Sequence, residues 1–396
     1  MPSRAADAAR ALQYPAPFAK RPPGDGPLVG RQRRSRIVAM QKALLALTMG
    51  DPAGVGPEIV ARACLHPQVQ ALSLPLVVGH AEVLRRAVAA LGTPVDVRVV
   101  EDVASARDAW DRDGIACLHV GSDDVLAAPP ARVDARCGRA AYDSVVAATR
   151  LALHGDVDGI VTAPLNKEAL AAAGVTYPGH TELLADLCGV DEFAMMLYLG
   201  PGDRVRGPHG LGVAHVTLHM ALADVFARLD TAAVAEKIRL CHGAMRRFGA
   251  ARPRIGVAAL NPHAGEQGLF GDEEQRVIAP AVRLSSDEGI DVAGPFPADT
   301  LMVRAAAGEF DGVVAMYHDQ GHIALKLLGM FDAVNVTLGL PIVRTSVAHG
   351  TAFDLVDGAS SVGRTPVSIT GMIAAVRAAS LLARRASVGH GAHDTA

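Results

Sequence analysis

Apolar runs of strand length alternate with longer amphipathic stretches along the chain from Lys42 onward. The runs are Ala43–Met49, Leu74–Val78, Gly159–Thr162, Gly212–Thr217, Ile255–Leu260, Val313–Met316 and Ala333–Thr337. The stretches between most of them are rich in Ala, Leu and Arg, and two of them, Ala140–His154 and Leu222–Phe248, have apolar residues at the three- and four-residue spacing of a helix. This alternation predicts an α/β fold in which helices cover both faces of a mainly parallel sheet.

The length and the charge of the chain limit its organisation and its partners. With 396 residues, it is long enough for two domains or for one large domain. Its formal net charge of −3 provides no electrostatic attraction for nucleic acid or for an anionic membrane. The late apolar run Gly371–Ala383 is interrupted by Arg377, and no run approaches the ~18–20 residues of a spanning helix. We therefore expect neither a nucleic-acid partner nor a membrane partner.

Five cysteines are scattered along the sequence without a Cys-x-x-Cys pair. They are Cys64, Cys117, Cys137, Cys188 and Cys241. An odd number at irregular spacing does not suit a disulfide framework, and isolated thiols do not suit a thiolate metal site. We expect buried thiols in a reducing compartment, and we take this compartment to be the cytoplasm.

The first 40 residues differ from the rest of the chain. They contain eight basic and two acidic residues, a run rich in Pro and Gly at Arg21–Pro27 and a basic cluster at Arg31–Arg36. Organelle transit peptides are also rich in Arg and poor in acidic residues, so this alternative stays open. We favour a disordered basic leader over residues 1–40, with Met40 opening the folded part, because this composition offers no apolar face to bury.

A glycine-rich loop, Gly50–Glu58, follows the first apolar run and leads into a helical stretch. Pro57 stands where the first turn of a helix tolerates proline. Two interpretations remain open: a tight strand-to-helix turn without a ligand, or a loop whose backbone N–H groups bind an anion at a helix N-terminus. The loop lacks the third glycine of the dinucleotide-binding fingerprint, since Ile59 occupies that position.

Three histidines each follow a predicted strand: His219, His263 and His318. In an open α/β sheet, ligands bind beyond the carboxyl ends of the strands, so three such imidazoles can converge although they are distant in sequence. Three protein ligands with an open position are typical of a catalytic divalent metal. Each histidine alone would be an ordinary loop residue. Together they predict a metal site, with Glu266 and Asp319 beside two of them as hydrogen-bond partners or proton acceptors.

Other residues of the sequence are suited to binding anions. His180 can form a hydrogen bond with an oxyanion, and Thr181 can cap a helix over Leu183–Leu187. Lys326 and Arg344 add cations that can hold a phosphate or a carboxylate. As single residues, both cations are also compatible with a solvated surface position.

Six sequence strings together resemble the 4-hydroxythreonine-4-phosphate dehydrogenase family of vitamin B6 biosynthesis. They occur in the order and at the spacing of that family, and the match extends from about Leu44 to Ala379. The strings that contain histidine are the specific ones. The six strings are Gly50–Glu58, Gly179–Leu184, Asn261–Glu266, Pro297–Thr300, Met316–Gly321 and Asn335–Arg344.

The resemblance implies a fold of the isocitrate/isopropylmalate dehydrogenase type. Such a fold has two α/β/α domains, and the active site lies in the cleft between them. Residues 41–178 and 345–386 are then expected to form a first, discontinuous domain, and residues 179–344 a second domain that carries the metal histidines.

A further segment, His349–Asp354, is similar to the adenosine-binding loop of those dehydrogenases, with Phe353 in place of their proline. This similarity implies NAD or NADP as the cofactor, and it explains how such an enzyme lacks the usual glycine fingerprint. The implied cofactor-binding residues are His349, Gly350, Thr351 and Asp354.

The same resemblance implies the roles of the site residues. The ligands of one divalent ion, such as zinc, magnesium or cobalt, would be His219, His263 and His318. The family is homodimeric and builds this site from both subunits, so His318 can serve the partner's site. The substrate-binding positions match His180, Thr181, Lys326, Asn335 and Arg344, and the catalytic positions match Lys326, Asp319 and Asp299.

The chain departs from the family pattern next to the first metal ligand. Where many members have Leu-Pro-Leu-Arg-Asp after the histidine, this chain has Met220–Asp224, and His215 is an additional histidine. The missing arginine leaves the polar surroundings of the expected metal site different from those of such members.

These parts predict an enzyme that oxidises 4-phosphooxy-L-threonine, with NAD and a divalent metal, to a β-keto acid. This acid would decarboxylate to 3-amino-2-oxopropyl phosphate in pyridoxal phosphate (pyridoxine) biosynthesis. An alternative is a D-threonate or D-erythronate 4-phosphate dehydrogenase of sugar-acid catabolism, a branch that Pro164–Leu170, Tyr177–His180 and Gly321–Ile323 resemble. A metal-dependent lyase or hydrolase without redox chemistry is less favoured, because the adenosine-type loop argues against it.

Overall fold

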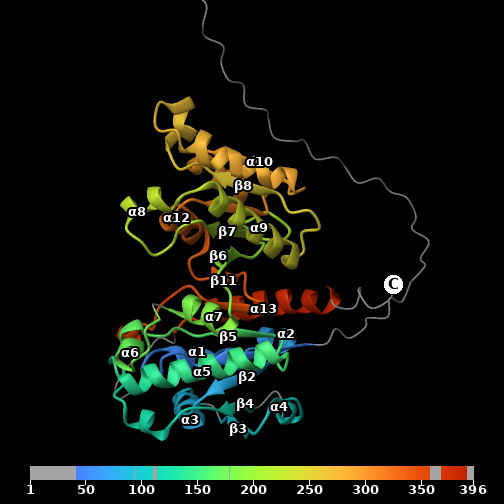
Figure 1. Cartoon of the computed structure of the whole chain (residues 1–396). Coiled ribbons are helices and arrows are strands. Elements are labelled where there is room, and N and C mark those ends of the chain that lie inside the picture. Colours follow the sequence, from blue (N-terminus) through green and yellow to red (C-terminus); the bar gives the residue numbers. More distant parts are fainter. Residues whose placement is uncertain (1–41, 93, 110–113, 178, 357–366, 390–396) are drawn as a thin grey trace, which may run out of the picture. The chain divides into compact units, whose positions relative to one another are not determined.

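The apolar runs of the sequence form strands of one sheet (Figure 1). The computed structural model describes residues 42–92, 94–109, 114–177, 179–356 and 367–389, so the expected leader lies outside the described residues. Within these ranges the sheet has twelve strands in the order β3-β4-β2-β1-β5-β12-β11-β6-β7-β10-β8-β9. The strands are β1 (Ala43–Thr48), β2 (Ser73–Gly79), β3 (Asp96–Val100), β4 (Gly114–His119), β5 (Gly159–Thr162), β6 (Ala194–Leu199), β7 (Leu211–His215), β8 (Ile255–Ala258), β9 (Val292–Phe296), β10 (Gly312–Ala315), β11 (Val334–Leu338) and β12 (Arg344–Val347).

Most neighbouring strands are parallel, as the sequence predicts, whereas the middle of the sheet is antiparallel. Strand β6 pairs antiparallel with both β7 and β11, and β11 pairs antiparallel with β12. The β6–β7 and β11–β12 connections contain no helix in the described residues. A loop can join antiparallel strands, but a parallel pair requires a long crossover. The α/β fold is therefore confirmed, and its antiparallel centre is the part that the alternation of elements did not predict.

Helices occupy most segments between the strands. Ala140–His154 lies within α5, and Leu222–Phe248 is divided into α8 and α9, because Asp230 accepts a hydrogen bond from the N–H of Ala233 and starts a new helix. The helices are α1 (Gly56–Cys64), α2 (Pro67–Leu72), α3 (Ala81–Ala90), α4 (Val103–Ala109), α5 (Ala135–His154), α6 (Lys167–Ala172), α7 (His180–Cys188), α8 (Leu222–Arg228), α9 (Thr231–Phe248), α10 (Ala279–Asp287), α11 (Ala298–Ala306), α12 (His318–Gly329) and α13 (Thr370–Gly389), with the short turns η1 (Asp123–Ala127), η2 (Pro262–Gly268), η3 (Glu274–Ile278) and η4 (Phe353–Leu355).

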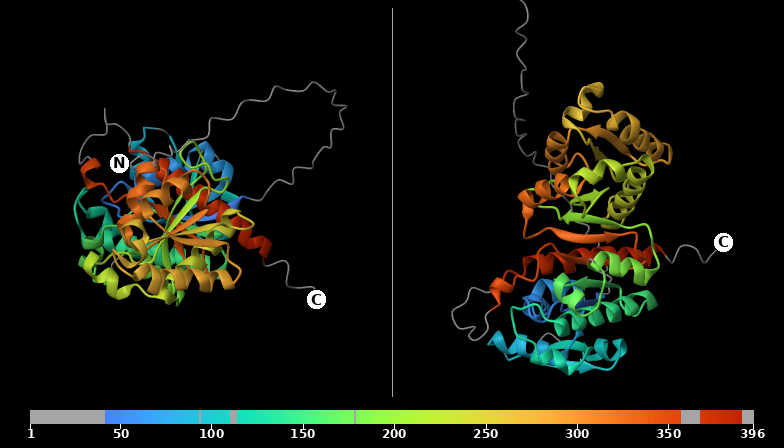
Figure 2. Two further views of the ribbon diagram at one scale, coloured as in Figure 1. Left: turned by 90° about the horizontal axis from the view of Figure 1, so that it is seen from above. Right: turned by 60° about the vertical axis from the view of Figure 1, so that its left-hand side comes forward.

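The central strands are buried beneath these helices. Every residue of β1, β5 and β12 is buried. Helix α13 packs against β12 and β5 (Figure 1), and the strands that follow β6 fan out in the left view of Figure 2. Since β1, β5 and β12 are adjacent and parallel, their carboxyl ends lie side by side. This edge is where an open α/β sheet binds its ligands.

The expected two-domain division is not marked by a break in the sheet. Strand β12 pairs with β5 on one side and with β11 on the other, so the sheet continues from one expected domain into the other. The division into residues 41–178 with 345–386 and residues 179–344 remains a prediction.

The state of the cysteines and the character of the helices can be compared with what the sequence predicts. All five cysteines are free thiols, and four of them are buried, whereas Cys188 is only half-buried. No helix in the described part of the chain combines the length and the apolar character needed to cross a membrane.

Candidate active site

A cavity of about 430 Å³ lies at the carboxyl ends of β5 and β12 and brings together most of the predicted anion-binding residues. We call it the β12 pocket. The polar residues that line it come from five separate parts of the chain. They include Thr162, Lys167, His180, Thr181, Glu182, His219, Asn335, Arg344, His349 and Gly350. Four of the five predicted substrate-binding residues, one predicted metal ligand and two predicted cofactor-binding residues therefore share one pocket.

Arg344 is the largest buried polar group of this pocket. Its side chain is 2% exposed, Nη1 donates to Thr337 Oγ1 at 2.9 Å and Nη2 donates to Thr162 Oγ1 at 2.8 Å. Its Nε has no partner among the described residues. Burial lowers the pKa of Arg344 to about 9, so the group stays cationic at neutral pH. A buried cation is normally paired with an anion. The hydrogen-bond partners of this one are neutral hydroxyls, and the charge of Glu182 only partly offsets the effect of burial on the pKa of Arg344.

Two more buried polar atoms of the pocket have no protein partner. They are Nε2 of His180 and Oδ1 of Asn335. Burial, and then the charge of Arg344, hold the pKa of His180 well below its usual range, so its imidazole is neutral. Nearly all buried polar atoms in native proteins are hydrogen-bonded. Several unpaired atoms around one cavity therefore point to a polar ligand, and the adjacent cation makes an anion the best fit.

The sequence-based prediction overlooked Lys167 and Glu182, which also line the pocket. Their charges act on His219: burial and then Lys167 lower the pKa of His219, while Glu182 acts in the opposite direction. Lys167 follows the carboxyl end of β5 by five residues. The position after a buried strand was the signal that could have identified it, as it identified the histidines.

Thr181 does not cap its helix as predicted. Helix α7 begins one residue earlier, at His180, and its N-cap is Gly179, which makes no side-chain hydrogen bond. The backbone of Gly179 is extended, with φ of 176°. The helix therefore starts early enough to place Thr181 in its first turn, where Thr181 lines the β12 pocket.

Two of the three predicted metal ligands lie close together. The rings of His219 and His318 are 5.6 Å apart between centroids. His318 is the first residue of α12, and its Nδ1 lies 2.6 Å from Oδ1 of Asp319. Carboxylates that accept from one ring nitrogen commonly orient metal-binding histidines, because the other nitrogen then keeps its lone pair. Asp319 is therefore arranged as an orienting partner of His318.

His263 does not join this pair within one chain. It lies in η2, where residues 263–267 all have positive φ, between 44° and 77°. The buried carboxylate of Glu274 supports this left-handed turn by accepting hydrogen bonds from the N–H groups of Leu260 and Asn261, at 2.8 and 2.7 Å. Strands β7, β10 and β8, which precede His219, His318 and His263, are consecutive in the sheet, so the strand order itself does not separate His263 from the pair. The described residues contain no group of three or more His, Cys, Asp or Glu that suits a metal ion.

None of the three predicted catalytic residues lines the β12 pocket. Asp319 lies beside His318. Lys326 lies on α12, two turns after His318. Asp299 lies in the first turn of α11, where it accepts a hydrogen bond from the N–H of Thr300 at 2.8 Å. A single chain therefore brings His180, Thr181, Asn335 and Arg344 to the pocket but leaves these three residues outside it.

The glycine-rich loop and the adenosine-type loop pack against each other. The N–H of Val55 donates to the carbonyl of Thr351 at 3.0 Å, and a Cβ on Gly54 would lie only 2.9 Å from the same oxygen. The N–H groups of Ala53 and Gly54 are bound by Asp51. Since these donors are occupied, the geometry favours a tight turn over an anion site. Asp354, at the other end of the second loop, is exposed.

Asp51 makes the stability of this loop depend on pH. Burial raises the pKa of Asp51 to about 6, so the folded state binds a proton more tightly than the unfolded chain, in which Asp titrates near ~3.9. Stability is therefore lost as pH rises through this window. We expect Asp51→Asn, which keeps the acceptor for Ala53, to raise the free energy of unfolding at pH 7 by up to roughly 3 kcal/mol. Denaturant unfolding between pH 4 and 8 measures this. The prediction is contradicted if the free energy of unfolding depends on pH in the same way in Asp51→Asn and in wild type between the two pKa values. Asp203→Asn, at an exposed site, is the control.

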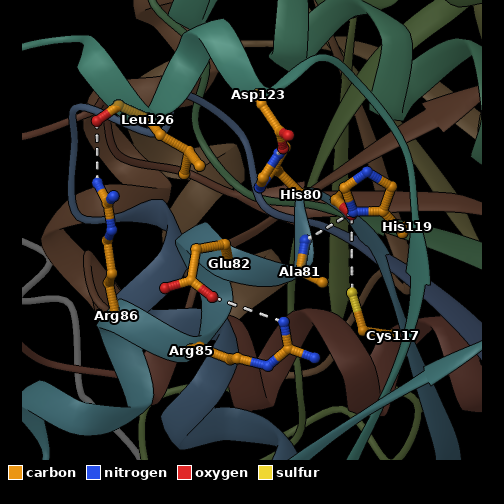
Figure 3. Close-up of polar contacts among 10 residues, drawn as sticks. His80, Ala81, Glu82, Arg85, Arg86, Cys117, His119, Asp123 and Leu126 are labelled. Atoms are coloured by element: carbon orange, nitrogen blue, oxygen red, sulfur yellow. Dashed lines mark hydrogen bonds and ion pairs between the residues drawn. The ribbon is translucent and has the colours of Figure 1, made fainter.

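A second group of polar side chains lies at the carboxyl ends of β2 and β4 (Figure 3). His80 Nε2 lies 3.0 Å from Oδ1 of Asp123, and the N–H of Ala81 donates to Nδ1 of His119 at 3.2 Å (Figure 3). The first N–H groups of a helix have no partner within it, so His119 satisfies one at the start of α3. These contacts give the group a structural role.

The chain is similar to several named dehydrogenases. A family model described as pyridoxal phosphate biosynthetic protein PdxA matches residues 71–379. The chain is 49% identical over 314 residues to the 4-hydroxythreonine-4-phosphate dehydrogenase of Beijerinckia indica subsp. indica, covering 78% of this chain and 88% of the relative. It is also 49% identical over 321 residues to the D-threonate 4-phosphate dehydrogenase of Salmonella typhimurium, covering 80% and 93%. The crystal structure of the 4-hydroxythreonine-4-phosphate dehydrogenase from Klebsiella pneumoniae is similar with a TM-score of 0.74 and 42% identity, covering 86% of this chain and 100% of that one.

Proposed function

Because the chain belongs to the family of the pyridoxal phosphate biosynthetic protein PdxA, we propose that it oxidises 4-phosphooxy-L-threonine with NAD and a divalent metal. The chain is an oxidoreductase that acts on a CH–OH group, as its named relatives are. In the proposed reaction the secondary alcohol becomes a ketone as NAD is reduced. The resulting β-keto acid loses CO₂ to give 3-amino-2-oxopropyl phosphate, for pyridoxal phosphate biosynthesis in the cytoplasm.

The observation that carries the proposal is the buried, unpaired cation of the β12 pocket. Arg344 has hydroxyl partners but no carboxylate partner among the described residues. A phosphate or carboxylate of the substrate would supply the missing anion, with His180 and Asn335 as further contacts. Thr181 and Lys326 complete the proposed substrate-binding set. Contacts made far from the reacting carbon provide binding energy that orients the substrate.

A divalent metal fits the imidazole pair beside this pocket. His219 and His318 supply nitrogen ligands of the type that zinc and cobalt sites use, whereas magnesium favours oxygen ligands. The hydrogen bond between His318 and Asp319 supports the assignment, because it leaves Nε2 free to bind. When bound, such an ion lowers the pKa of an alcohol and polarises a carbonyl.

The proposed third ligand, His263, would come from a second copy of the chain, whereas the family resemblance implied that His318 serves the partner's site; the proximity of His318 to His219 within one chain is the reason for this choice. Helix α12, which starts at His318, has an exposed apolar face that includes Ile323 and Leu327, at 59% and 79% exposure. Met330 and Phe331 extend this face. An apolar surface beside an incomplete ligand set favours a homodimer with shared sites. The same arrangement would bring Asp299 and Lys326 to the site of the partner.

The proposed cofactor site uses the loop that carries His349, Gly350, Thr351 and Asp354. His349 and Gly350 line the β12 pocket, which would put the cofactor next to the substrate. NAD or NADP supplies the oxidising power. For the alcohol proton, the hydrogen bond of Asp319 to His318 makes Asp319 a weaker candidate and favours Lys326 as the acceptor.

A second candidate substrate is D-threonate or D-erythronate 4-phosphate, which carries no amine. The charges that line the β12 pocket favour this candidate: the cations of Lys167 and Arg344 face the single carboxylate of Glu182. An ammonium group would therefore have Glu182 as its only oppositely charged partner among the described lining residues. This candidate keeps the chemistry and changes only the group at the neighbouring carbon.

A panel of phosphorylated hydroxy acids tests the proposal. The full chain, loaded with metal, is assayed by the absorbance of reduced nicotinamide with 4-phosphooxy-L-threonine, D-threonate 4-phosphate and D-erythronate 4-phosphate, using NAD and NADP. The dephosphorylated acids should lose roughly 100-fold or more in kcat/KM, because at least two charge-assisted hydrogen bonds are lost. Glu182→Gln should slow only the substrate that carries an amine. Turnover without nicotinamide reduction would sink the proposal in favour of a lyase or hydrolase.

A further inference from the structure

We propose that His215 and His322 are positioning residues that hold the ring of His318 ready for metal binding. The rings of both residues contact or lie near the ring of His318, and neither residue belongs to the sites assigned above. His215 is the additional histidine at the end of β7, and His322 lies one helical turn after His318 on α12. The inference rests on the proposed role of His318 as a metal ligand.

The pair links the sheet to the start of α12 through a chain of hydrogen bonds. Nδ1 of His215 lies 3.3 Å from the carbonyl oxygen of Met195 in β6. Nε2 of His215 lies 3.1 Å from Nδ1 of His322. Nδ1 of His322 also lies 3.2 Å from the carbonyl oxygen of His318. His318 is therefore tied through two buried side chains to the antiparallel centre of the sheet.

These contacts fix the tautomers of both neutral rings. A carbonyl oxygen can only accept, so Nδ1 of His215 carries the hydrogen and its Nε2 is the acceptor. Nδ1 of His322 must then be the donor, which also suits its contact with the carbonyl of His318. Since one tautomer satisfies every contact, the two rings have little freedom to turn. A third ring that packs against them is therefore restrained as well.

The ring of His318 is packed in this way. The rings of His318 and His322 are stacked, with 3.7 Å between centroids and 12° between planes. Nδ1 of His318 also lies 2.6 Å from Oδ1 of Asp319. His318 is thus held by stacking on one ring and by a hydrogen bond to one carboxylate, which together set the direction of Nε2.

Gly321 shows that the fold makes room for this arrangement. A Cβ at this position would lie 2.5 Å from Nε2 of His215 and 2.6 Å from Cγ1 of Val213. Any larger residue would displace His215 from the hydrogen bond with His322. Gly321, His215 and His322 therefore act as one unit, although they come from β7 and α12.

The test measures the affinity of the metal in the absence of substrate. The metal-free full chain is titrated with Co²⁺, and its visible absorption is recorded. His322→Phe keeps a ring to stack on His318 but loses the donor, and His215→Leu loses the acceptor. Loss of an outer hydrogen-bond partner typically costs 10- to 100-fold in metal affinity, so we expect the Co²⁺ dissociation constant to rise by roughly 10- to 100-fold and the absorption band to change. His215→Gln keeps an acceptor and should recover part of the affinity.

Controls separate this inference from the proposed function. His242→Phe, at a half-buried histidine of α9, should stay within about twofold of wild type. If wild type binds Co²⁺ and His318→Ala does not, while His215→Leu and His322→Phe bind as wild type does, the positioning inference is wrong and the metal site stands. If wild type binds no Co²⁺, both the positioning inference and the proposed metal site are wrong. Should His215→Leu not fold, Gly321→Ala displaces the same ring and carries the test, with the melting temperature as the check on folding.

Discussion

Replacing His219 by alanine is expected to remove the metal from the protein while the fold survives. The variant loses a direct ligand, so its metal dissociation constant should rise by more than the roughly 100-fold that loss of an outer partner can cost. No protein hydrogen bond is lost with it, because none of the hydrogen bonds found in the described residues involves the His219 side chain. The measurements are metal content after dialysis and the melting temperature. Full metal content with wild-type turnover would exclude His219 as a ligand, and His154→Ala, on exposed α5 surface, is the matched control.

The same substitution can decide whether the site is shared between two chains. His219→Ala and His263→Ala subunits are each expected to be inactive alone. If His263 serves the partner's site, a mixed dimer contains one site with all its ligands. Random mixing should then restore about a quarter of the activity, because half of the dimers are mixed and each has one intact site out of two. No recovery would mean that both histidines serve the same chain's site.

The sequence predicts the fold well where local chemistry decides it. The apolar runs match seven of the strands, and β5 begins and ends at the expected residues. The direction in which neighbouring strands pair is not decided by local sequence. The antiparallel pairs β6–β7 and β11–β12 are each joined by a loop without a helix, and the alternation of elements does not predict strand direction. The split of Leu222–Phe248 at Asp230 was readable in principle, since an aspartate before a helical stretch is an N-cap.

In the site, too, residue types could be predicted from the sequence, whereas the placement of the residues could be predicted only in part. The rule that ligands gather after strands identified His219 and His318, which do lie together. It did not predict that His263 lies apart from them in one chain, because the path of the left-handed turn η2 that carries His263 cannot be read from a position after a strand. Burial was equally invisible: a lone arginine such as Arg344 suggests a surface position, whereas here it is 2% exposed. Lys167 was missed although it lies in Pro164–Leu170 and follows a buried strand, because the resemblance assigned it no role.

Because Arg344 is buried in the pocket, we expect the second large effect on activity from Arg344→Met. Two charge-assisted hydrogen bonds to an anion are worth about 1.5–3 kcal/mol each, so kcat/KM should fall by roughly 100- to 10,000-fold. Methionine has a similar length and no charge. We expect inorganic phosphate to raise the melting temperature of wild type, because a ligand that binds only the folded state stabilises it. The variant should lose this rise.

The stability of the same variant separates binding from structure. If Arg344 existed to hold β11 and β5 together through Thr337 and Thr162, its removal would lower the free energy of unfolding. If it is an uncompensated buried cation that waits for a substrate anion, its replacement by an apolar side chain should leave stability unchanged or raise it. We expect the second result, a variant at least as stable as wild type and nearly inactive. Arg344→Lys keeps the charge without the planar fork, so it should recover only part of the activity. Loss of stability together with normal phosphate binding would show that Arg344 is structural.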